Sequence, residues 1–158
     1  MAVRIRLGDA ADVDAAVSVY ERSNLARRHG VWRDRAARVE QVRARLADPG
    51  SWLLVAEDGP VVVGMASAEA LRGEAGAGPV VPGGCFLSML FVVPERWDEG
   101  IGGAILDAVL GEARRRHYSR IHLWTHRDNE RSQRLYRRRG FSPTGRTMED
   151  KGEWARRI

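Results

Sequence analysis

The chain has 158 residues, a net charge of +5 and 44% hydrophobic residues, a balance typical of a folded protein, and its length suits one domain over residues 1–158. No apolar run approaches the roughly 18 residues that cross a bilayer, and the N-terminus has no apolar signal segment, so we expect a cytoplasmic protein without membrane insertion. The single cysteine, Cys85, excludes an internal disulfide, and the four histidines show no spacing typical of a metal site.

The positive charge comes almost entirely from arginine. Lys151 is the only lysine, and much of the excess lies in two runs, Arg114–Arg116 and Arg137–Arg139. Such runs are typical of solvated helix ends, where cations complement the helix dipole. They also fit recognition of a phosphate-bearing partner, because the guanidinium fork binds two oxygens at once. On charge alone this partner is either a small nucleotide-like cofactor or a nucleic acid.

The first predicted elements are a strand and two helices. Val3–Leu7 alternates apolar and basic residues, which is the period of a half-buried strand. Asp9 or Asp12 can cap the helix that follows, whose apolar residues recur from Val13 at helical spacing. A second helix is predicted over Arg33–Leu46, ending before the Pro-Gly turn that follows it.

The middle of the chain predicts a β-hairpin. Trp52–Glu57 and Val61–Leu71 have the composition of strands, and the Asp-Gly pair between them is a strong hairpin signal. The next segment, Arg72–Gly84, is rich in glycine and proline and predicts a flexible loop between two strands. This loop is either a tolerated surface excursion or a mobile flap beside a binding site.

The remaining elements alternate between strands and helices. Cys85–Val93 is a nearly continuous apolar segment, which predicts a central strand buried on both faces. The pattern then predicts a helix over 101–116, a strand over 119–125, a helix over 129–139 and two closing strands, 141–148 and 152–158. The order predicts a mixed α/β fold, with a central twisted, mostly antiparallel sheet of about seven strands flanked by about four helices.

The segment Trp97–Gly103, WDEGIGG, leads from the central strand into the helix over 101–116. Gly100 lets the chain turn without a Cβ penalty, and Gly102 and Gly103 let a ligand approach the first helical turn. The N–H groups of that turn lack intrahelical partners and lie at the positive end of the helix dipole. We therefore predict a site for a phosphate or pyrophosphate, here named the phosphate cradle (Trp97–Gly103).

Two other phosphate-binding motifs do not fit. A Walker A loop needs Gly-Lys-Ser/Thr, which the chain lacks, and a dinucleotide fingerprint would need glycine in place of Ile105. Instead, V-x-P-x-x-W-x-x-G-I-G over residues 92–102 and N-x-x-S-x-x-L-Y-x-x-x-G-F over residues 129–141 resemble the GNAT superfamily of N-acetyltransferases. The element order fits that superfamily from Val3 onward.

The resemblance implies acetyl-CoA as the donor substrate and central strands that splay apart. In the superfamily one splayed strand pairs with the pantetheine arm, the cradle wraps the pyrophosphate, and a tyrosine hydroxyl protonates the leaving thiolate. Matched by motif position, this tyrosine is Tyr136, which serves as the general acid. The implied cofactor contacts come from Leu90, Phe91, Val92, Trp97, Asp98, Glu99, Gly100, Ile101, Gly102, Gly103, Asn129 and Tyr136.

The phosphate cradle departs from the superfamily pattern. It begins with Trp97, where the superfamily usually has glutamine or arginine, and Asp98 and Glu99 follow. Carboxylates that pointed inward would repel a pyrophosphate. Because backbone N–H groups bind the pyrophosphate in the superfamily, these side chains can point to solvent instead. The basic side chains that could offset this charge are Arg96, Arg134 and Arg138.

The general base is the second departure. Many superfamily members place an acid on the strand just before the Leu-Phe-Val run, whereas this chain has Ser88 and Met89 there. Ser88 acting through a water is therefore one candidate for a catalytic role. The other candidates are Glu69, His122 and His126.

The leading hypothesis is an acetyl-CoA-dependent N-acetyltransferase in which a primary amine of a small molecule or peptide attacks the thioester directly. Another acyl-CoA donor is the nearest enzymatic alternative. From a different class, a CoA-binding sensor or partner-binding module of the same fold would fit the missing base and the acidic cradle. Nucleic-acid binding through the arginine runs ranks last. An exposed edge strand near residues 152–158 would allow a homodimer.

Overall fold

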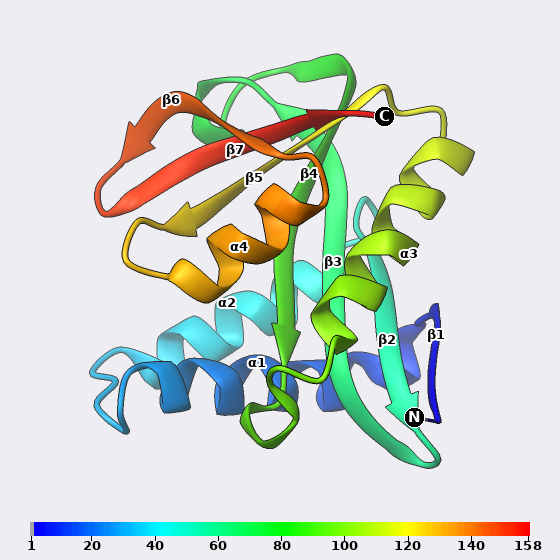
Figure 1. Ribbon diagram of the computed structural model, residues 1–158, viewed down its shortest axis with the longest axis vertical. Coiled ribbons are helices and arrows are strands. Elements are labelled where there is room, and N and C mark those ends of the chain that lie inside the picture. The colour runs from blue at the N-terminus through cyan, green and yellow to red at the C-terminus, as the bar shows by residue number, and fades with distance from the viewer. Residues whose placement is uncertain (1) are drawn as a thin grey trace.

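A computed structural model describes residues 2–158, except for the side chain of Ala75 (Figure 1). One seven-stranded sheet runs through it in the order β1-β2-β3-β4-β5-β7-β6. Its strands are β1 (Val3–Leu7), β2 (Trp52–Asp58), β3 (Val61–Arg72), β4 (Val80–Val92), β5 (Arg120–His126), β6 (Ser142–Met148) and β7 (Lys151–Arg157). Only β4 and β5 pair in parallel. The mostly antiparallel sheet that the sequence predicts is confirmed.

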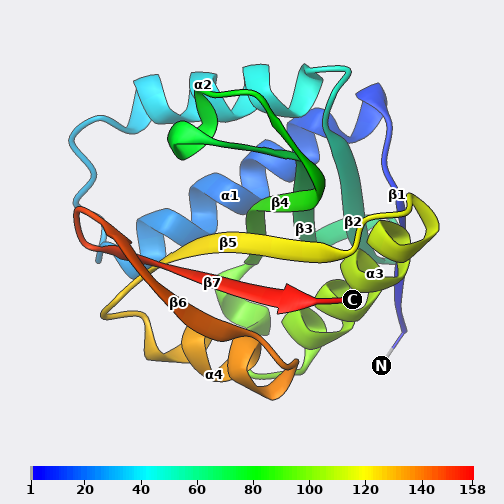
Figure 2. The same ribbon diagram turned by 90° about the horizontal axis from the view of Figure 1, so that it is seen from above.

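Four α-helices cover the two faces of this sheet. Figure 2 shows α1 and α2 on one face and α3 and α4 on the other. They are α1 (Val13–Arg27), α2 (Arg35–Ala47), α3 (Ile101–Arg115) and α4 (Glu130–Arg138). Apolar side chains fill the layers between them, and Met65, Ile105 and Leu106 are among the largest that are fully buried. The four predicted helices are thus confirmed, with ends that differ from the expectation by one or two residues.

The loop between β3 and β4 is shorter than the glycine-rich sequence predicts. A 3-10 turn, η2 (Glu74–Gly76), closes it, and β4 already begins at Val80, which pairs with Arg72 of β3. The prediction of a loop over all of Arg72–Gly84 is therefore wrong at its C-terminal end. Backbone pairing across a hairpin requires no apolar side chains. A strand can therefore form where the glycine and proline content predicts a loop.

At the C-terminal end of the chain, the strand at the edge of the sheet is β6 and not the last strand, β7. The prediction that residues 152–158 form an exposed edge is wrong, because β7 lies between β5 and β6. Glu153 and Trp154 of β7 are buried, whereas all seven residues of β6 are exposed. Pro143 and Gly145 suit such an edge, because an edge strand tolerates missing donors and weak packing. The expected homodimer stays a prediction, and β6 and β1, the two edge strands of the described sheet, are the strands available for pairing.

Strands β4 and β5 pair over only a short length. Their register joins Gly84–Phe86 to Arg120–His122, and beyond these residues the strands separate, as the resemblance implies. A β-bulge lies at the point of separation: Leu87 and Met89 pair with consecutive residues of β3, so Ser88 is the extra residue. Because a bulge bends its strand, it directs the end of β4 away from β5.

The entry into α1 depends on a capping box. Asp9 caps the 3-10 turn η1 (Ala10–Asp12), and its side chain accepts from the N–H of Ala11 at 2.9 Å. Asp12 accepts in return from the N–H of Asp9 at 2.9 Å and from the guanidinium of Arg6 at 2.8 and 2.9 Å. Chiefly through the bond to Arg6, the pKa of Asp12 falls from 3.8 to about 2.

We predict that Asp12→Asn destabilises the protein in a pH-dependent manner. Because the folded pKa of Asp12 lies below its unfolded value, its stabilisation is present above pH 3.8 and is lost as the pH falls through about 2. We expect urea denaturation to show a loss of about 1 kcal/mol at pH 7, less than the full pKa difference implies, because solvent screens the ion pair. The difference between wild type and variant should shrink at pH 3.

The matched control is Asp14→Asn in the first turn of α1. The side chain of Asp14 is 87% exposed, so its ion pair with Arg43 should contribute little. Equal losses for the two variants, or a loss at Asp12 that does not change with pH, would contradict the prediction.

Candidate active site

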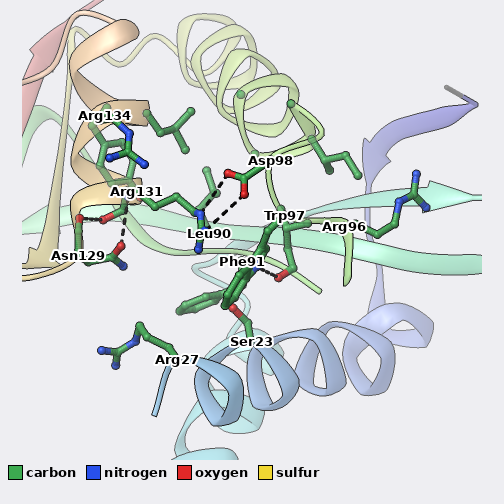
Figure 3. Close-up of a pocket in the computed structure, with 18 of the residues that line it drawn as sticks. Ser23, Arg27, Leu90, Phe91, Arg96, Trp97, Asp98, Asn129, Arg131 and Arg134 are labelled. Carbon is green, nitrogen blue, oxygen red and sulfur yellow. Dashed lines mark hydrogen bonds and ion pairs between the residues drawn. The ribbon is translucent and has the colours of Figure 1, made fainter. Parts of the chain in front are cut away.

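A cavity of about 770 Å³ lies where the end of β4, the start of α3, α4 and the end of α1 meet (Figure 3). We call it the first cavity. It brings together nearly all the predicted site residues, from segments far apart in the sequence. Those that line it are Leu90, Phe91, Val92, Trp97, Asp98, Gly100, Ile101, Gly102, Gly103, Asn129 and Tyr136. Glu99 and Ser88 are the two predicted residues outside this lining.

The start of α3 presents free backbone donors to the first cavity. Gly100 is the N-cap residue with a φ of +84°, a left-handed conformation that favours glycine. No side chain caps the helix, and its first intrahelical bond from the N–H of Ala104 reaches the carbonyl of Gly100 at 3.1 Å. The N–H groups of residues 101–103 therefore have no partner in the helix. Their direction and the helix dipole favour an anion at this place.

The two acids of the phosphate cradle are each paired with an arginine. Glu99 accepts from Arg96 at 2.9 and 3.0 Å, and Arg96 also reaches Asp58 at 3.0 Å. Asp98 accepts from Arg131 at 3.3 and 3.4 Å, and Figure 3 shows this pair beside the cavity. The carboxylates that the sequence sets beside the anion site are therefore balanced by cations.

Arginines make up most of the charged side chains that line the first cavity. Asp98 is its only acidic lining residue within the described chain. The lining arginines are Arg27, Arg96, Arg131, Arg134, Arg138 and Arg139. Sequence reasoning missed Arg27 and Arg131. Arg131 precedes Ser132 of the second motif but comes near Trp97, at 4.6 Å from its ring centroid, only when α4 packs beside the cradle.

The separated end of β4 supplies further backbone groups. The N–H of Val93 donates to the carbonyl of Val63 on β3 at 2.9 Å. Antiparallel strands exchange hydrogen bonds at every second residue, so the backbone of Phe91 also faces β3. The N–H and C=O groups of Leu90 and Val92 therefore point away from β3, toward the first cavity. Phe91 can therefore offer the cavity only its side chain.

Trp97 fixes the cradle against this strand. Its indole N–H donates to the carbonyl of Val92 at 2.8 Å, drawn as a dashed line in Figure 3. The residue that departs from the superfamily pattern therefore ties the loop before α3 to β4. It leaves the N–H groups of Leu90 and Val92 and the carbonyl of Leu90 as the free polar groups of this edge.

Asn129 and Tyr136 reach the cavity from α4. The Asn129 side chain caps this helix by accepting from the N–H of Ser132 at 3.2 Å. Tyr136 is 7% exposed and packs edge-to-face on Phe141, with ring centroids 5.7 Å apart. Burial raises the pKa of Tyr136 above its ordinary value of 10, so its hydroxyl stays protonated at neutral pH. The phenol can therefore donate a proton or a hydrogen bond to a group bound in the cavity.

A second cavity, of about 430 Å³, holds three of the four candidate bases. It lies on the other side of the β4 bulge and is lined by Ser88, Glu69 and His122 among other residues. The hydroxyl of Ser88 donates to the carbonyl of Ser67 at 2.9 Å. The fourth candidate, His126, lines neither of the two cavities and bonds to Asp150 at 3.0 Å.

The family model of the GNAT acetyltransferases matches residues 13–141, which include both sequence motifs and the first cavity. The chain belongs to the GNAT acetyltransferase family. Comparison of the sequence with those of curated proteins gives no significant match.

Solved structures share the GNAT fold over the whole chain. The yncA protein of Salmonella typhimurium, solved with its cofactor acetyl-CoA, is 25% identical, covering 98% of this chain and 93% of its own, with a TM-score of 0.72. The PaiA N-acetyltransferase of Thermoplasma acidophilum, solved with coenzyme A, is 15% identical over 100% of both chains, with a TM-score of 0.77. The GNAT domain of PAT from S. lividans is 14% identical, covering 99% of this chain and 90% of its own, with a TM-score of 0.79.

Within residues 2–158, no group of three or more histidine, cysteine, aspartate or glutamate side chains is arranged to bind a metal. None of the helices in the described part of the chain is long and apolar enough to cross a membrane. Cys85 is fully buried, and burial raises the pKa of its thiol to about 12, so it packs as a small apolar residue rather than acting as a nucleophile.

Proposed function

We propose that the protein is an acetyl-CoA-dependent N-acetyltransferase that acetylates a primary amine of a small molecule or peptide by direct attack. One observation carries this proposal: the uncapped start of α3, the free backbone edge of Leu90 and Val92, and the hydroxyl-bearing ring of Tyr136 line the same cavity. Membership of the GNAT acetyltransferase family supports it, as do the two similar structures solved with acetyl-CoA and coenzyme A.

The cavity has the groups that the donor requires. The N–H groups of residues 101–103 suit a pyrophosphate, and Gly102 keeps the space in front of them open. The free edge of Leu90 and Val92 suits the amide groups of a pantetheine arm. Arg134 and Arg138 on the cavity wall suit an additional phosphate. When bound, the donor supplies an acetyl thioester, which is activated toward attack by an amine.

The chain contributes two groups to acyl transfer. The N–H of Val92 is our candidate to donate to the carbonyl oxygen as negative charge develops on it. The hydroxyl of Tyr136 is our candidate proton donor to the departing thiolate, because its raised pKa keeps it protonated over the physiological range. Neither role needs an acylated side chain, in keeping with the inert thiol of Cys85.

Calorimetric titration with acetyl-CoA tests the proposal first, with desulfo-CoA and NADH as comparison ligands. We expect micromolar binding of acetyl-CoA, weak or no binding of NADH, and thiol release when a suitable amine is added. Binding without thiol release from a broad amine panel would favour a CoA-binding sensor. No binding at millimolar acetyl-CoA would overturn the proposal and favour a partner-binding module.

We predict that Gly102→Val weakens acetyl-CoA binding at least about tenfold, which is about 1.4 kcal/mol. A Cβ at Gly102 would point toward Leu90, Val92 and Leu135, at 3.5–3.9 Å, so the added methyl groups would occupy the space of the donor. The control is Gly111→Val in the same helix, because a Cβ there would meet nothing within 4 Å. Equal dissociation constants for the two variants in calorimetry would contradict the assignment of the cradle.

We predict that Tyr136→Phe lowers kcat by roughly 10–100-fold and leaves the dissociation constant of acetyl-CoA unchanged. The ring and its contact with Phe141 remain, and only the proton donor is lost. Tyr118→Phe is the control, because Tyr118 is also partly buried but lines neither cavity. Thiol release under saturating acetyl-CoA measures kcat, and a kcat equal to that of the control would remove Tyr136 from the mechanism.

A further inference from the structure

The second cavity adjoins the first along β4. Phe86 and Ser88 line the second cavity and Leu90 lines the first, so only Met89 separates the two linings on this strand. Figure 2 shows the hairpin between β3 and β4 lying between α2 and β5, and residues of all four elements line the second cavity. A molecule bound there would lie at the point where β4 and β5 separate.

A histidine and a buried glutamate form a pair in this cavity. The Nδ1 atom of His122 lies 3.2 Å from Oε2 of Glu153, whose side chain is 3% exposed. Glu153 also accepts from the hydroxyl of Thr144 at 2.7 Å and from Arg146 at 3.4 Å. Because a carboxylate only accepts hydrogen bonds, Nδ1 carries the hydrogen in this pair. The Nε2 atom of a neutral His122 therefore has a free lone pair, as a proton acceptor requires.

His122 stands at the junction of the two strands. It pairs with Phe86 in the last register position that joins β5 to β4. Sequence reasoning named His122 as one candidate base but missed Glu153, which lies on β7 and comes beside it only through the pairing of β5 with β7. Glu69, the acidic residue among the candidate bases, accepts a hydrogen bond from Arg45 at 2.8 Å.

Cations outnumber carboxylates in the second cavity. Its lining contains two glutamates, Glu69 and Glu153, and five cations: Arg45, Arg72, Arg120, Arg146 and Lys151. Three of these, Arg72, Arg120 and Lys151, form no ion pair with any carboxylate of residues 2–158. Arg120 and Lys151 are also half-buried, so fewer water molecules can compensate their charge. An anionic group on the bound molecule would balance them.

We infer that the second cavity binds an acceptor amine that also carries an acidic group, such as a carboxylate, and that His122, oriented by Glu153, accepts its ammonium proton. The inference rests on the proposed function. Arg120 and Lys151 bind the acidic group, and the same cations disfavour the ammonium form of the amine, which assists its deprotonation. A diamine or polyamine has no acidic group and is repelled by this cavity.

The ammonium gives one proton to Nε2 of His122, and the nitrogen lone pair then forms a C–N bond to the acetyl carbon. The C–S bond breaks, the sulfur keeps the bonding electron pair and takes up a proton, and the amide nitrogen loses its second proton. Overall, one amide and one thiol form, and one proton is released to water.

The first test compares the kcat/KM of amino acids with that of their amides, with putrescine as a diamine. The amides are less basic and would react faster if basicity alone decided. We expect the acids to be preferred at least about tenfold, because an unpaired polar group in a site costs this much or more. Arg120→Gln and Lys151→Gln should raise the KM for the acids. Arg114→Gln, an exposed residue of α3 without an ion pair, should leave it unchanged.

The second test concerns His122 and Glu153. We expect His122→Ala to lower kcat by about 100-fold, and added imidazole to restore part of the rate. Glu153→Gln should lower kcat by about tenfold with an unchanged KM, because its amide can hold the ring in the wrong tautomer. Calorimetry with acetyl-CoA shows whether each variant is folded.

The outcomes separate the inference from the proposed function. Turnover of amides and putrescine without a preference for acids would overturn the acidic acceptor and leave the acetyltransferase activity standing. An unchanged kcat in His122→Ala, or a loss that imidazole does not restore, would overturn the role of His122. Absence of thiol release with every amine would overturn both the inference and the proposed function.

Discussion

The separation of β4 from β5 is the constraint on which the rest of the site depends. Backbone N–H and C=O groups inside a protein require partners, and a fully paired sheet would consume those of both strands. Here the pairing ends at Phe86 and His122, and the bulge at Ser88 directs the rest of β4 away. The freed groups of Leu90 and Val92 then face a cavity, where a ligand with amide groups can satisfy them. The same separation places His122 at the boundary of a second cavity.

Arginine chemistry governs both cavities. The chain has a single lysine, so nearly every cationic side chain carries a planar guanidinium. A guanidinium can pair with a carboxylate and stack on an aromatic ring at the same time. Arg131 does both, with Asp98 and with Trp97, and so balances the charge of one of the two acids of the phosphate cradle. Arg146 similarly reaches Glu153 while lying over the ring of Trp124. The acids that conflict with anion binding in the sequence are thus part of the network that supports it.

In the proposed mechanism, the two cavities divide the chemistry between the two sides of the β4 bulge. The first has helix donors, free strand groups and a protonated phenol, which suit a phosphate-bearing thioester. The second has a histidine with a free Nε2 and unpaired cations, which suit the nucleophile. In the proposed mechanism, the proton acceptor for the amine and the proton donor for the leaving sulfur therefore belong to different elements, β5 and α4.

The sequence by itself determined the features that depend on neighbours along the chain. The period of apolar residues predicts the helices, the capping acids predict the start of α1, and the glycines of the cradle predict an anion site. The two motifs predict the family, because they combine several residues at fixed spacing. Prediction from local composition was wrong where strand pairing does not follow composition. At Val80, a segment rich in glycine and proline already belongs to a strand.

Tertiary structure alone decided the features that depend on strand order and register. β7 lies inside the sheet and β6 at its edge, although both are short polar strands at the end of the chain. The same order brings Glu153 beside His122, 31 residues away in the sequence. Strand alternation assigns the free backbone groups to Leu90 and Val92 and gives those of Phe91 to β3. Ser88 lies in the second cavity because the bulge sets its direction. Each of these depends on hydrogen bonds between distant segments, which no local pattern encodes.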